Sequence, residues 1–340
     1  MDIFDFLNLI GGLALFLYGM HKMGESLTEM AGSKMQQILE RLTSNKFVGV
    51  LLGMAVTAVI QSSSATTVMV VGFVNSGVMK LSQAVGIIMG ANIGTTITSW
   101  ILSMAGLESD MLFIKLLKPT SFAPVMAAIG VILLMTAREQ SKKKHVAGIM
   151  LGFAILMMGM NTMTTAVSGL ADNPAFTDLM TAFDNPFLGV LMGVILTAAI
   201  QSSSASVGIL QALSMTGVIS YYAAIPIVLG QNIGTCVTSL ISSVGTSRNA
   251  RRTAMVHLYF NITGAVIFMM GFFLLNIFMA PTLQTMANPA GIAVIHSIFN
   301  IVTTVILFPF SDKLVAWAHA TIPDGRDYKT KTSISKGRAS

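Results

Sequence analysis

The sequence predicts an all-α polytopic membrane protein made of two inverted-topology repeats, each with a re-entrant hairpin, and about seven full transmembrane helices. Three observations support this fold class. Of the 340 residues, 54% are apolar and only 10% are charged, whereas soluble domains carry about 25% charged residues. No Asp, Glu, Lys or Arg occurs between Asp184 and Arg248 or between Arg252 and Asp312, and one membrane span needs about 20 apolar residues. The third observation is an internal repeat.

The repeat is clearest around two short polar motifs. Residues 47–65 match residues 187–205 at 13 of 19 positions, a shift of 140 along the chain, and residues 90–99 match 230–239 at 7 of 10 positions. Each copy contains Gln-Ser-Ser-Ser, and the Asn of an Asn-Ile-Gly-Thr motif follows 31 residues after the Gln. The chain is therefore predicted to hold two copies of one structural unit.

Seven apolar segments are long enough to cross a bilayer, namely 5–20, 82–104, 112–137, 147–170, 222–245, 253–280 and 291–318. Segments 47–77 and 187–217 differ, because about 31 residues are many for one span and few for two. About ten helical residues reach the membrane midplane, so each of these segments is predicted to be a re-entrant hairpin with Gln-Ser-Ser-Ser at its tip. Residues 24–46 are predicted to form an amphipathic helix on the cytoplasmic surface.

The predicted domain organisation follows from these segments. It consists of a first transport repeat at 5–137, a basic cytoplasmic linker at 138–146, a second, inverted repeat at 147–280, an additional transmembrane helix at 291–318 and a polar, basic cytoplasmic tail at 319–340.

Basic residues predict the orientation, because short cytoplasmic loops collect Lys and Arg. If both hairpins re-enter, the N-terminus lies outside, the C-terminus is cytoplasmic, and 18 of the 20 basic residues share one face, leaving Lys115 and Lys118 outside. Full crossing by both hairpins would split them 15 to 5, so the re-entrant arrangement is favoured. Each unit then has an odd number of crossings, which makes the second unit inverted, as in secondary transporters.

The two duplicated motifs are the predicted binding site. A helix that breaks at Gln-Ser-Ser-Ser frees N–H groups that attract an anion, and it frees carbonyl oxygens that suit Na⁺. Because these motifs contain no charged side chain, an anion and its cations must neutralise each other there. The candidate substrate-binding residues are Gln61, Ser62, Ser63, Ser64, Asn92, Thr95, Gln201, Ser202, Ser203, Ser204, Asn232 and Thr235. The candidate sodium ligands are Gln61, Ser64, Thr95, Gln201, Ser204 and Thr235.

Paired Gln-Ser-Ser-Ser motifs, each followed by Gly-x-Asn-Ile-Gly-Thr, resemble the sodium/phosphate cotransporter family of type II symporters, over nearly all of residues 5–310. The resemblance implies a minimal-core member in a bacterial inner membrane that carries inorganic phosphate with sodium, without an organic cofactor or a nucleic-acid partner. It also implies that the two Gln-Ser-Ser-Ser segments face each other. The family's His-x-x-Phe-Asn signature is present at 257–261 and again at 296–300, whereas the first unit has Pro-Thr-Ser-Phe-Ala at 119–123.

Other functions remain open at this level. Phosphate, as opposed to another small oxyanion, rests on the resemblance alone. An ion channel also uses hydroxyl and carbonyl linings. An intramembrane hydrolase would need one activated serine and an oxyanion hole, which two matching serine triplets do not resemble, so the chain is not expected to be an enzyme. The sequence does not fix the oligomeric state, and a homodimer is one candidate.

Overall fold

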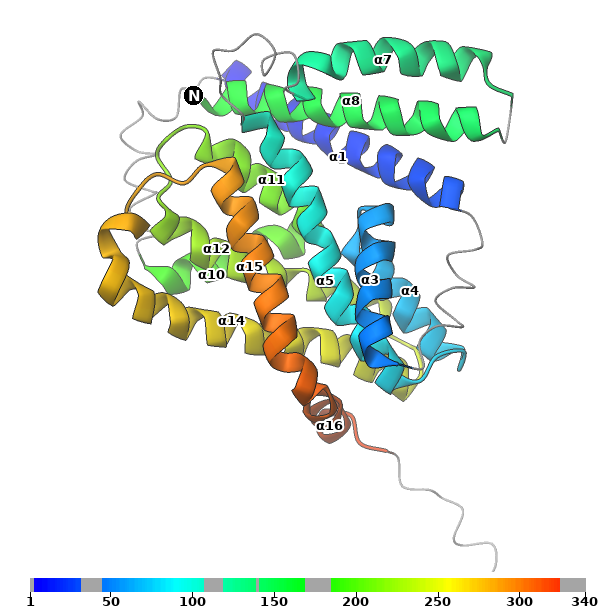
Figure 1. The fold of residues 1–340 in the computed structure, drawn as a ribbon, viewed down its shortest axis with the longest axis vertical. Coiled ribbons are helices and arrows are strands. Elements are labelled where there is room, and N and C mark those ends of the chain that lie inside the picture. The colour runs from blue at the N-terminus through cyan, green and yellow to red at the C-terminus, as the bar shows by residue number, and fades with distance from the viewer. Residues whose placement is uncertain (1–2, 32–44, 107–118, 139–140, 169–184, 325–340) are drawn as a thin grey trace, which may run out of the picture.

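The apolar segments of the sequence fold into helices, and the part of the chain that the structure describes contains no strand. The structure, a computed structural model, describes residues 3–31, 45–106, 119–138, 141–168 and 185–324 (Figure 1). Its α-helices are α1 (Ile3–Ala31), α3 (Lys46–Ile60), α4 (Ser63–Asn75), α5 (Leu81–Ser103), α7 (Pro119–Thr136), α8 (Lys142–Val167), α10 (Pro186–Ile200), α11 (Ser203–Ser214), α12 (Tyr221–Gly234), α13 (Cys236–Ser242), α14 (Arg248–Leu283), α15 (Pro289–Leu307) and α16 (Ser311–Thr321), with short 3₁₀ helices η1 (Met104–Gly106) and η3 (Phe308–Phe310).

Within the residues that the structure describes, six helical stretches are long and apolar enough to cross a membrane. They are Ile3–Met30, Leu81–Gly106, Lys142–Val167, Tyr221–Ser242, Arg248–Leu283 and Pro289–Thr321. They confirm the predicted all-α polytopic membrane fold. The seventh predicted crossing, 112–137, overlaps α7. The apolar part of α7, Ser121–Thr136, is shorter than these six stretches. Residues 107–118 and the predicted tail after Asp324 lie outside the described residues.

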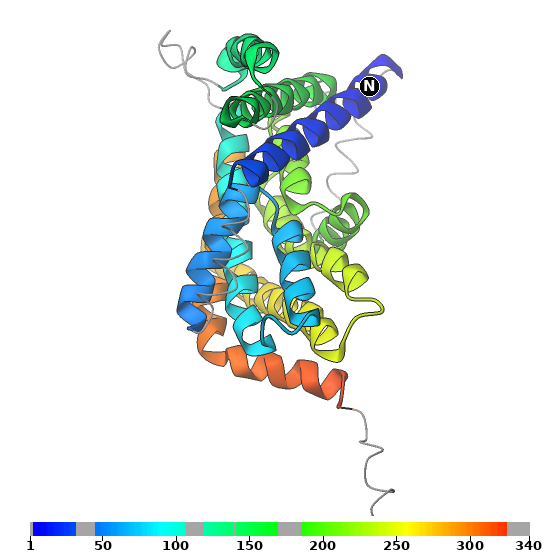
Figure 2. The ribbon, with the colours of Figure 1, turned by 90° about the vertical axis from the view of Figure 1, so that its right-hand side faces the viewer.

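The first hairpin enters the bundle and leaves it on the same side. A Cβ added to Gly86 of α5 would meet the carbonyl oxygen of Lys46, and one added to Gly94 would meet that of Met54. Since both numbers increase together, α3 and α5 run parallel in direct contact, and α4 returns between their ends (Figure 2). Two parallel neighbours need a returning segment between them, and α4 provides it.

The second hairpin, α10 and α11, repeats this arrangement from the opposite side. In α12, Gly230 approaches the carbonyl oxygen of Val190, and Gly234 approaches that of Val194, so α10 and α12 are also parallel. The exit of this hairpin is bonded to the turn between α14 and α15, through Ala287 N and the carbonyl oxygen of Ile219 at 2.7 Å. The exit of the first hairpin is bonded to the start of α14 instead, through Ser247 N and Asn75 Oδ1 at 2.8 Å. The two hairpins therefore open at opposite ends of α14.

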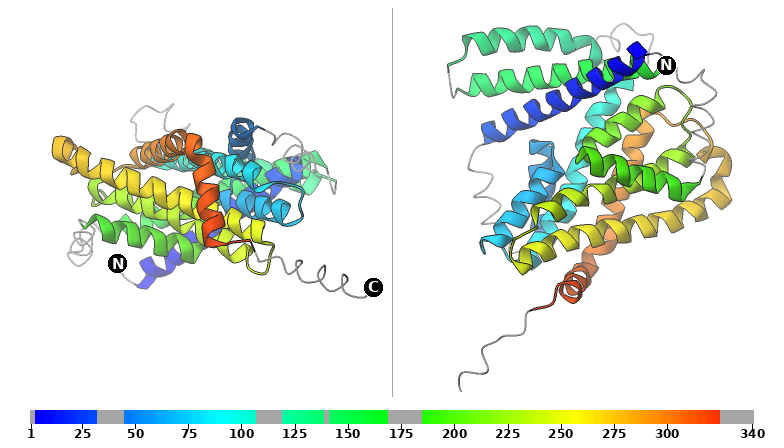
Figure 3. Two further views of the ribbon diagram at one scale, coloured as in Figure 1. Left: turned by 90° about the horizontal axis from the view of Figure 1, so that it is seen from below. Right: turned by 180° about the vertical axis from the view of Figure 1, so that it is seen from behind.

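Helices α1 and α8 cross on the axis that relates the two units. A Cβ on Gly19 would meet Leu156 N at 2.3 Å, and one on Gly159 would meet Phe16 N at 2.3 Å. Gly19 and Gly159 are matching positions of the repeat, so each copy presents the same surface to the other. The two helices run antiparallel and form one layer with α7, seen at one end of the molecule in Figure 3.

The basic residues at several helix ends lie on one side of the bundle. The end of α1, the end of α7, the start of α8 and the start of α14 lie at the right of Figure 1, whereas the start of α1 and the turn between α14 and α15 lie at the left. The basic residues at 142–144 and at 248–252 therefore share a side. Helix α16 covers the same end of α5, α14 and α15, where Lys46 Nζ contacts Asp312 at 2.6 Å.

Candidate functional site

Both Gln-Ser-Ser-Ser motifs form the same sharp turn between two half-helices. Gln61 has φ 59° and ψ 26°, and Gln201 has φ 58° and ψ 25°. They are the only described non-glycine residues with a positive φ. In each turn the Gln N–H donates to a threonine carbonyl four residues earlier, at 2.7 Å. A left-handed non-glycine residue costs about 1–2 kcal/mol, and strain of this kind concentrates at functional sites.

The second residue of each motif caps the half-helix that follows. The Ser62 hydroxyl accepts from Ala65 N at 3.1 Å, and the Ser202 hydroxyl accepts from Ala205 N at 3.2 Å. The first intrahelical bonds run from the fourth residue after each cap, so the amides at Ser63, Ser64 and their copies precede the helical ladder. Ser62 and Ser202 thus shape the turns, and the backbone donors lie beside them.

The two turns meet in the middle of the molecule. Ser64 Oγ lies 3.4 Å from the carbonyl oxygen of Gln201. Ser63, Ser203 and Ser204 are buried, whereas Gln201 is exposed and Gln61 is buried. The N-terminal ends of α4 and α11 therefore converge on one region, each with the partial positive charge of a helix start. Such an arrangement can hold a small anion without a fixed cationic side chain.

A cavity of about 460 Å³ opens at this point. Gln61, Ser62 and Ser202 form one wall, and residues of α1 between Met20 and Glu29 form the other. The predicted surface helix at 24–46 is not a separate helix at residues 24–31, because these continue α1 without a break, and residues 32–44 lie outside the described part of the chain.

Two carboxylates of α1 thus join the cavity wall, and the sequence analysis missed them. Glu25 Oε2 lies 2.7 Å from Lys22 Nζ, and Glu29 Oε2 lies 3.1 Å from His145 Nδ1 of α8. The signal in the sequence is the four-residue spacing of Glu25 and Glu29, which puts both on one face of a helix.

The Asn-Ile-Gly-Thr residues line the helices that support the hairpins. The four residues predicted to bind substrate here, Asn92, Thr95, Asn232 and Thr235, are all buried, and each side chain already has a hydrogen-bond partner. Asn92 Nδ2 donates to Asn261 Oδ1 at 3.0 Å, and Asn232 Nδ2 donates to the carbonyl oxygen of Val228 at 2.9 Å. The hydroxyls of Thr95 and Thr235 donate to carbonyls of their own helices, at 3.1 and 3.0 Å.

The direct link from the first of these helices to the hairpin is Thr98. Its hydroxyl donates to Gln61 Oε1 at 2.9 Å. Thr98 lies one turn after Thr95, and its copy Thr238 is identical, so the repeat comparison contained the signal. Gly94 of the same Asn-Ile-Gly-Thr motif is helical. A glycine is required at this position for α5 to approach α3, because a side chain there would collide with Thr57 and with the backbone of α3.

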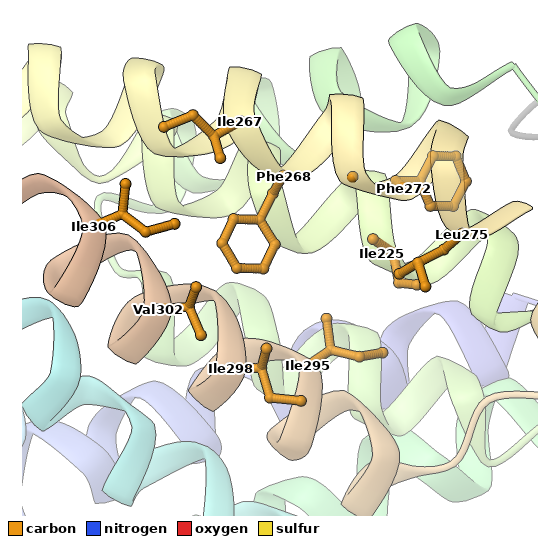
Figure 4. A pocket seen from close by; sticks show the side chains of 10 residues that line it. Ile225, Ile267, Phe268, Phe272, Leu275, Ile295, Ile298, Val302 and Ile306 are labelled. Atoms are coloured by element: carbon orange, nitrogen blue, oxygen red, sulfur yellow. The ribbon is translucent and has the colours of Figure 1, made fainter.

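A second cavity, of about 330 Å³, lies between α12, α14 and α15. Figure 4 shows that the labelled side chains lining it are hydrocarbon only, among them Phe268, Phe272 and Val302. A pocket of this composition offers no donor for an anion, so the polar cavity at the two turns is the candidate site.

Comparison with known proteins identifies the family. The Na⁺/Pi-cotransporter family profile matches residues 15–165 and again residues 155–295. The chain belongs to the Na⁺/Pi-cotransporter family. The double match also reproduces the internal repeat, with each Gln-Ser-Ser-Ser turn inside one copy.

Several relatives in this family are similar along most of the chain. Protein YqeW of Bacillus subtilis is 29% identical over 313 residues, which are 92% of this chain and 96% of that protein. The putative inorganic phosphate export protein YjbB of Escherichia coli K12 is 26% identical over 328 residues, so 96% of this chain spans 57% of that longer protein.

An animal protein is similar over a shorter region. The sodium-dependent phosphate transport protein 2A of Rattus norvegicus is 35% identical over 107 residues, which are 30% of this chain and 17% of that protein. No solved structure matches the chain.

Proposed function

We propose that this protein is a secondary active transporter that couples the symport of inorganic phosphate to sodium, and that it is not an enzyme. The observation that carries the proposal is the convergence of two inverted half-helix starts, α4 and α11, at the duplicated turns. Inverted repeats with broken helices at the midplane are the architecture of secondary transporters. The membership of the Na⁺/Pi-cotransporter family and the names of the E. coli and rat relatives support phosphate as the substrate.

Phosphate would bind at the helix starts. The backbone amides at Ser63, Ser64, Ser203 and Ser204 point along the axes of α4 and α11, and their hydroxyls add neutral donors. The side-chain amides of Gln61 and Gln201 stand at the turns themselves. Ser62 and Ser202 contribute indirectly, by holding the first turn of each helix through the cap bonds.

Sodium would bind to the oxygens left by the other half-helices. Each left-handed turn ends a helix. The carbonyls of Thr57 and Thr197 accept the Gln N–H, and that of Ala58 accepts the side-chain amide of Gln61. The last carbonyls after these would be available to Na⁺, because carbonyl and hydroxyl oxygens are ligands that it accepts. The proposed oxygen donors belong to Gln61, Ser64, Thr95, Gln201, Ser204 and Thr235. Sodium is cargo in this scheme, and it offsets the cost of bringing phosphate into a site of low dielectric constant.

Asn92, Thr95, Asn232 and Thr235 would form the supporting wall. Asn92 bonds to Asn261 of α14, and the other three side chains bond to carbonyls of their own helices, so in this conformation they would act as packing behind the turns. The domain boundaries proposed are those of the two repeats, 5–137 and 147–280, with the linker 138–146, the helix 291–318 and the tail 319–340.

The proposed location is a bacterial inner membrane, with the N-terminus outside and the C-terminus cytoplasmic. The clustering of basic residues beside the α7–α8 turn and the start of α14 supports this orientation. The cavity at Gln61 and Ser62 is lined by the last turns of α1, so it would open toward the cytoplasm.

Uptake by the purified full chain in proteoliposomes tests the function. Radiolabelled phosphate uptake is expected to saturate with phosphate concentration, to require an imposed sodium gradient and to resist competition by sulfate. Uptake that is equal with potassium in place of sodium would contradict sodium coupling. Flux that rises linearly with phosphate would indicate a channel, and competition by sulfate at equal concentration would indicate a general oxyanion carrier.

Phosphate export is a second direction for the same cycle, because the E. coli relative is named as an export protein. Loading the liposomes with phosphate and sodium, and then measuring efflux into buffer without sodium, tests it. Coupled efflux at a rate similar to uptake would show that the gradients alone set the direction.

A further inference from the structure

The two repeats have the same backbone turns but different side-chain bonds. In the first unit, Thr57 Oγ1 donates to Thr66 Oγ1 at 2.9 Å, which joins the two arms of the hairpin. The matching residues are Thr197 and Ser206. Both of their hydroxyl oxygens are fully buried, and neither has a hydrogen-bond partner within the described part of the chain.

The same difference occurs at the tip of the hairpin. Gln61 is 6% exposed and accepts the bond from Thr98 at 2.9 Å. Its copy, Gln201, is exposed. The Thr238 hydroxyl, which matches Thr98, is buried and finds no partner among the described residues. The first hairpin is therefore bonded to α5 through the side chain at its tip, whereas the second is bonded to α12 only behind its tip, where Gln231 Nε2 donates to the carbonyl oxygen of Ser206 at 3.0 Å.

Helix α15 takes, on the first unit, the position that α14 takes on the second. Helix α14 packs against α12, α4 and α5, whereas α15 packs against α5, α11 and α12. Exchanging the two units converts the first set into the second. The two helices cross where a Cβ on Gly264 would meet the side chain of Thr303 at 2.5 Å, and each of these residues is three positions after the Asn of its own His-x-x-Phe-Asn motif.

Both motifs have the same local structure. Asn261 Nδ2 donates to the carbonyl oxygen of His257 at 2.9 Å, and Asn300 Nδ2 donates to that of His296 at 2.8 Å. Each Asn thus turns its side-chain oxygen away from its own helix. All four residues are fully buried.

Hydrogen bonds from these Asn oxygens and His rings to other helices are again formed in the first of the two motifs only, the one on α14. Asn261 Oδ1 accepts from Asn92 at 3.0 Å, and His257 Nδ1 lies 3.1 Å from Ser239 Oγ. On α15, Asn300 Oδ1 and both ring nitrogens of His296 have no partner among the residues described. The residue that matches Asn92 is Asn232, and its amide donates to a carbonyl of its own helix, Val228.

We propose that Asn300 is the partner that Asn232 takes in the opposite conformation of the transport cycle, and that the Asn92–Asn261 bond opens when the Asn232–Asn300 bond forms. Asn300 and Asn261 are then positioning residues that favour alternate states. The inference rests on the proposed function, because an inverted-repeat transporter exchanges the conformations of its two units. A released Asn92 would bond to the carbonyl oxygen of Ile88, which matches Val228 in the repeat.

Cysteine accessibility in the full chain tests this exchange without phosphate or sodium. Ala65 lines the cavity and is exposed in the present conformation, and the native Cys236 is buried. In membrane vesicles, an impermeant maleimide is applied from the face on which Lys143→Cys reacts, and the labelling rate of Ala65→Cys is measured. A buried hydrogen bond is worth about a three- to tenfold change in a two-state ratio.

Asn261→Leu is expected to slow labelling of Ala65→Cys by about three- to tenfold, since it removes the bond of the present state. Asn300→Leu is expected to leave the rate equal or faster. Each variant loses the same bond to its own helix, so the comparison isolates the bond between helices. Ser297→Ala, on another face of α15 where it bonds Trp100, is the control and should not change the rate.

Equal slowing by both Leu variants, or no change in either, would overturn the proposal. If a Leu variant is not recovered as a monodisperse protein, Asn92→Ala and Asn232→Ala test the other member of each pair with the same expected difference. Uptake by the parent protein is measured separately, so a failure of phosphate transport is distinguished from a failure of the exchange.

Discussion

Gln61 and Gln201 show how a short polar motif determines a turn in an apolar chain. Their φ and ψ values agree to within 1° between the copies, so the local sequence suffices to specify this backbone. The following Ser caps the next helix in both copies. Residues next to a left-handed turn cannot continue the helical ladder, and their free N–H and C=O groups then remain for a ligand.

Replacing Gln61 separates its backbone role from its side-chain role. Gln61→Gly is expected to fold normally, because glycine adopts positive φ at no steric cost, and to lose phosphate uptake at least tenfold. Gln61→Val is expected to lower the unfolding free energy by about 1–2 kcal/mol, since a β-branched residue resists this conformation. Thermal unfolding and proteoliposome uptake measure the two effects. Full uptake by Gln61→Gly would show that the side chain of Gln61 is not part of the proposed site.

The serines after each cap are predicted to act jointly. Ser63→Ala or Ser203→Ala alone is expected to lower uptake at least tenfold while the protein remains folded, because both turns would contact one ligand. Ser76→Ala is the matched control, since Ser76 ends α4 away from the turn and bonds only to its own helix. Near-normal uptake by either variant would argue against a shared site.

At the scale of elements, close packing of helices relies on small residues. The α1–α8 crossing places Gly12 and Gly19 against the backbone of α8, and Gly152 and Gly159 against that of α1. In a membrane, such contacts provide much of the helix–helix attraction, because lipid is as apolar as the helix surface. Since the four glycines are matched by the repeat, this crossing is also the joint about which the units are related.

A pair of glycine substitutions tests the crossing. Gly19→Ala is expected to lower the unfolding free energy by about 1–3 kcal/mol, because its Cβ would collide with Leu156 N and Gly152 O. Gly11→Ala is the control, since nothing lies within 4 Å of its Cβ, and it is expected to be neutral or slightly stabilising. Thermal unfolding in detergent measures both. Equal midpoints for the two variants would show that the crossing is loose.

At the scale of the whole molecule, the two hairpins open at opposite ends of the helix bundle, and the connections between the other helices are divided between the same two ends. The α7–α8 turn and the start of α14 are on one side, and the α14–α15 turn is on the other. The basic residues collect on the first side. We expect this asymmetry to orient the chain in cells, because cytoplasmic loops carry an excess of Lys and Arg.

Side-specific labelling tests the orientation. Lys143→Cys and a tag at the C-terminus are expected to be labelled from the cytoplasm, and Gln284→Cys, in the exposed turn after α14, from outside. An impermeant maleimide on intact cells and on inside-out vesicles distinguishes the two. Labelling of Lys143→Cys and of the C-terminal tag from opposite sides would contradict the seven-crossing arrangement, and labelling of Gln284→Cys from the cytoplasm would contradict the proposed path of α14.

The sequence by itself determined the membrane class, the duplication and the two turns. These follow from the apolar content, from the match of 47–65 to 187–205 and from the local chemistry of Gln-Ser-Ser-Ser. The inversion of the second unit also followed from counting crossings. The sequence missed the length of α1, because the pairs of Glu25 with Lys22 and of Glu29 with His145 form only after folding.

Only the tertiary structure decided which partners the polar side chains take. Thr57 and Thr197 have nearly the same local sequence, yet the Thr57 hydroxyl is bonded to Thr66 and the Thr197 hydroxyl has no partner among the described residues. The motif at 296–300 is visible in the sequence, but its position opposite the first unit follows from how α15 packs on α5. Backbone turns depend on neighbouring residues, whereas side-chain bonds between helices depend on packing across the molecule, so copies with the same local sequence can differ.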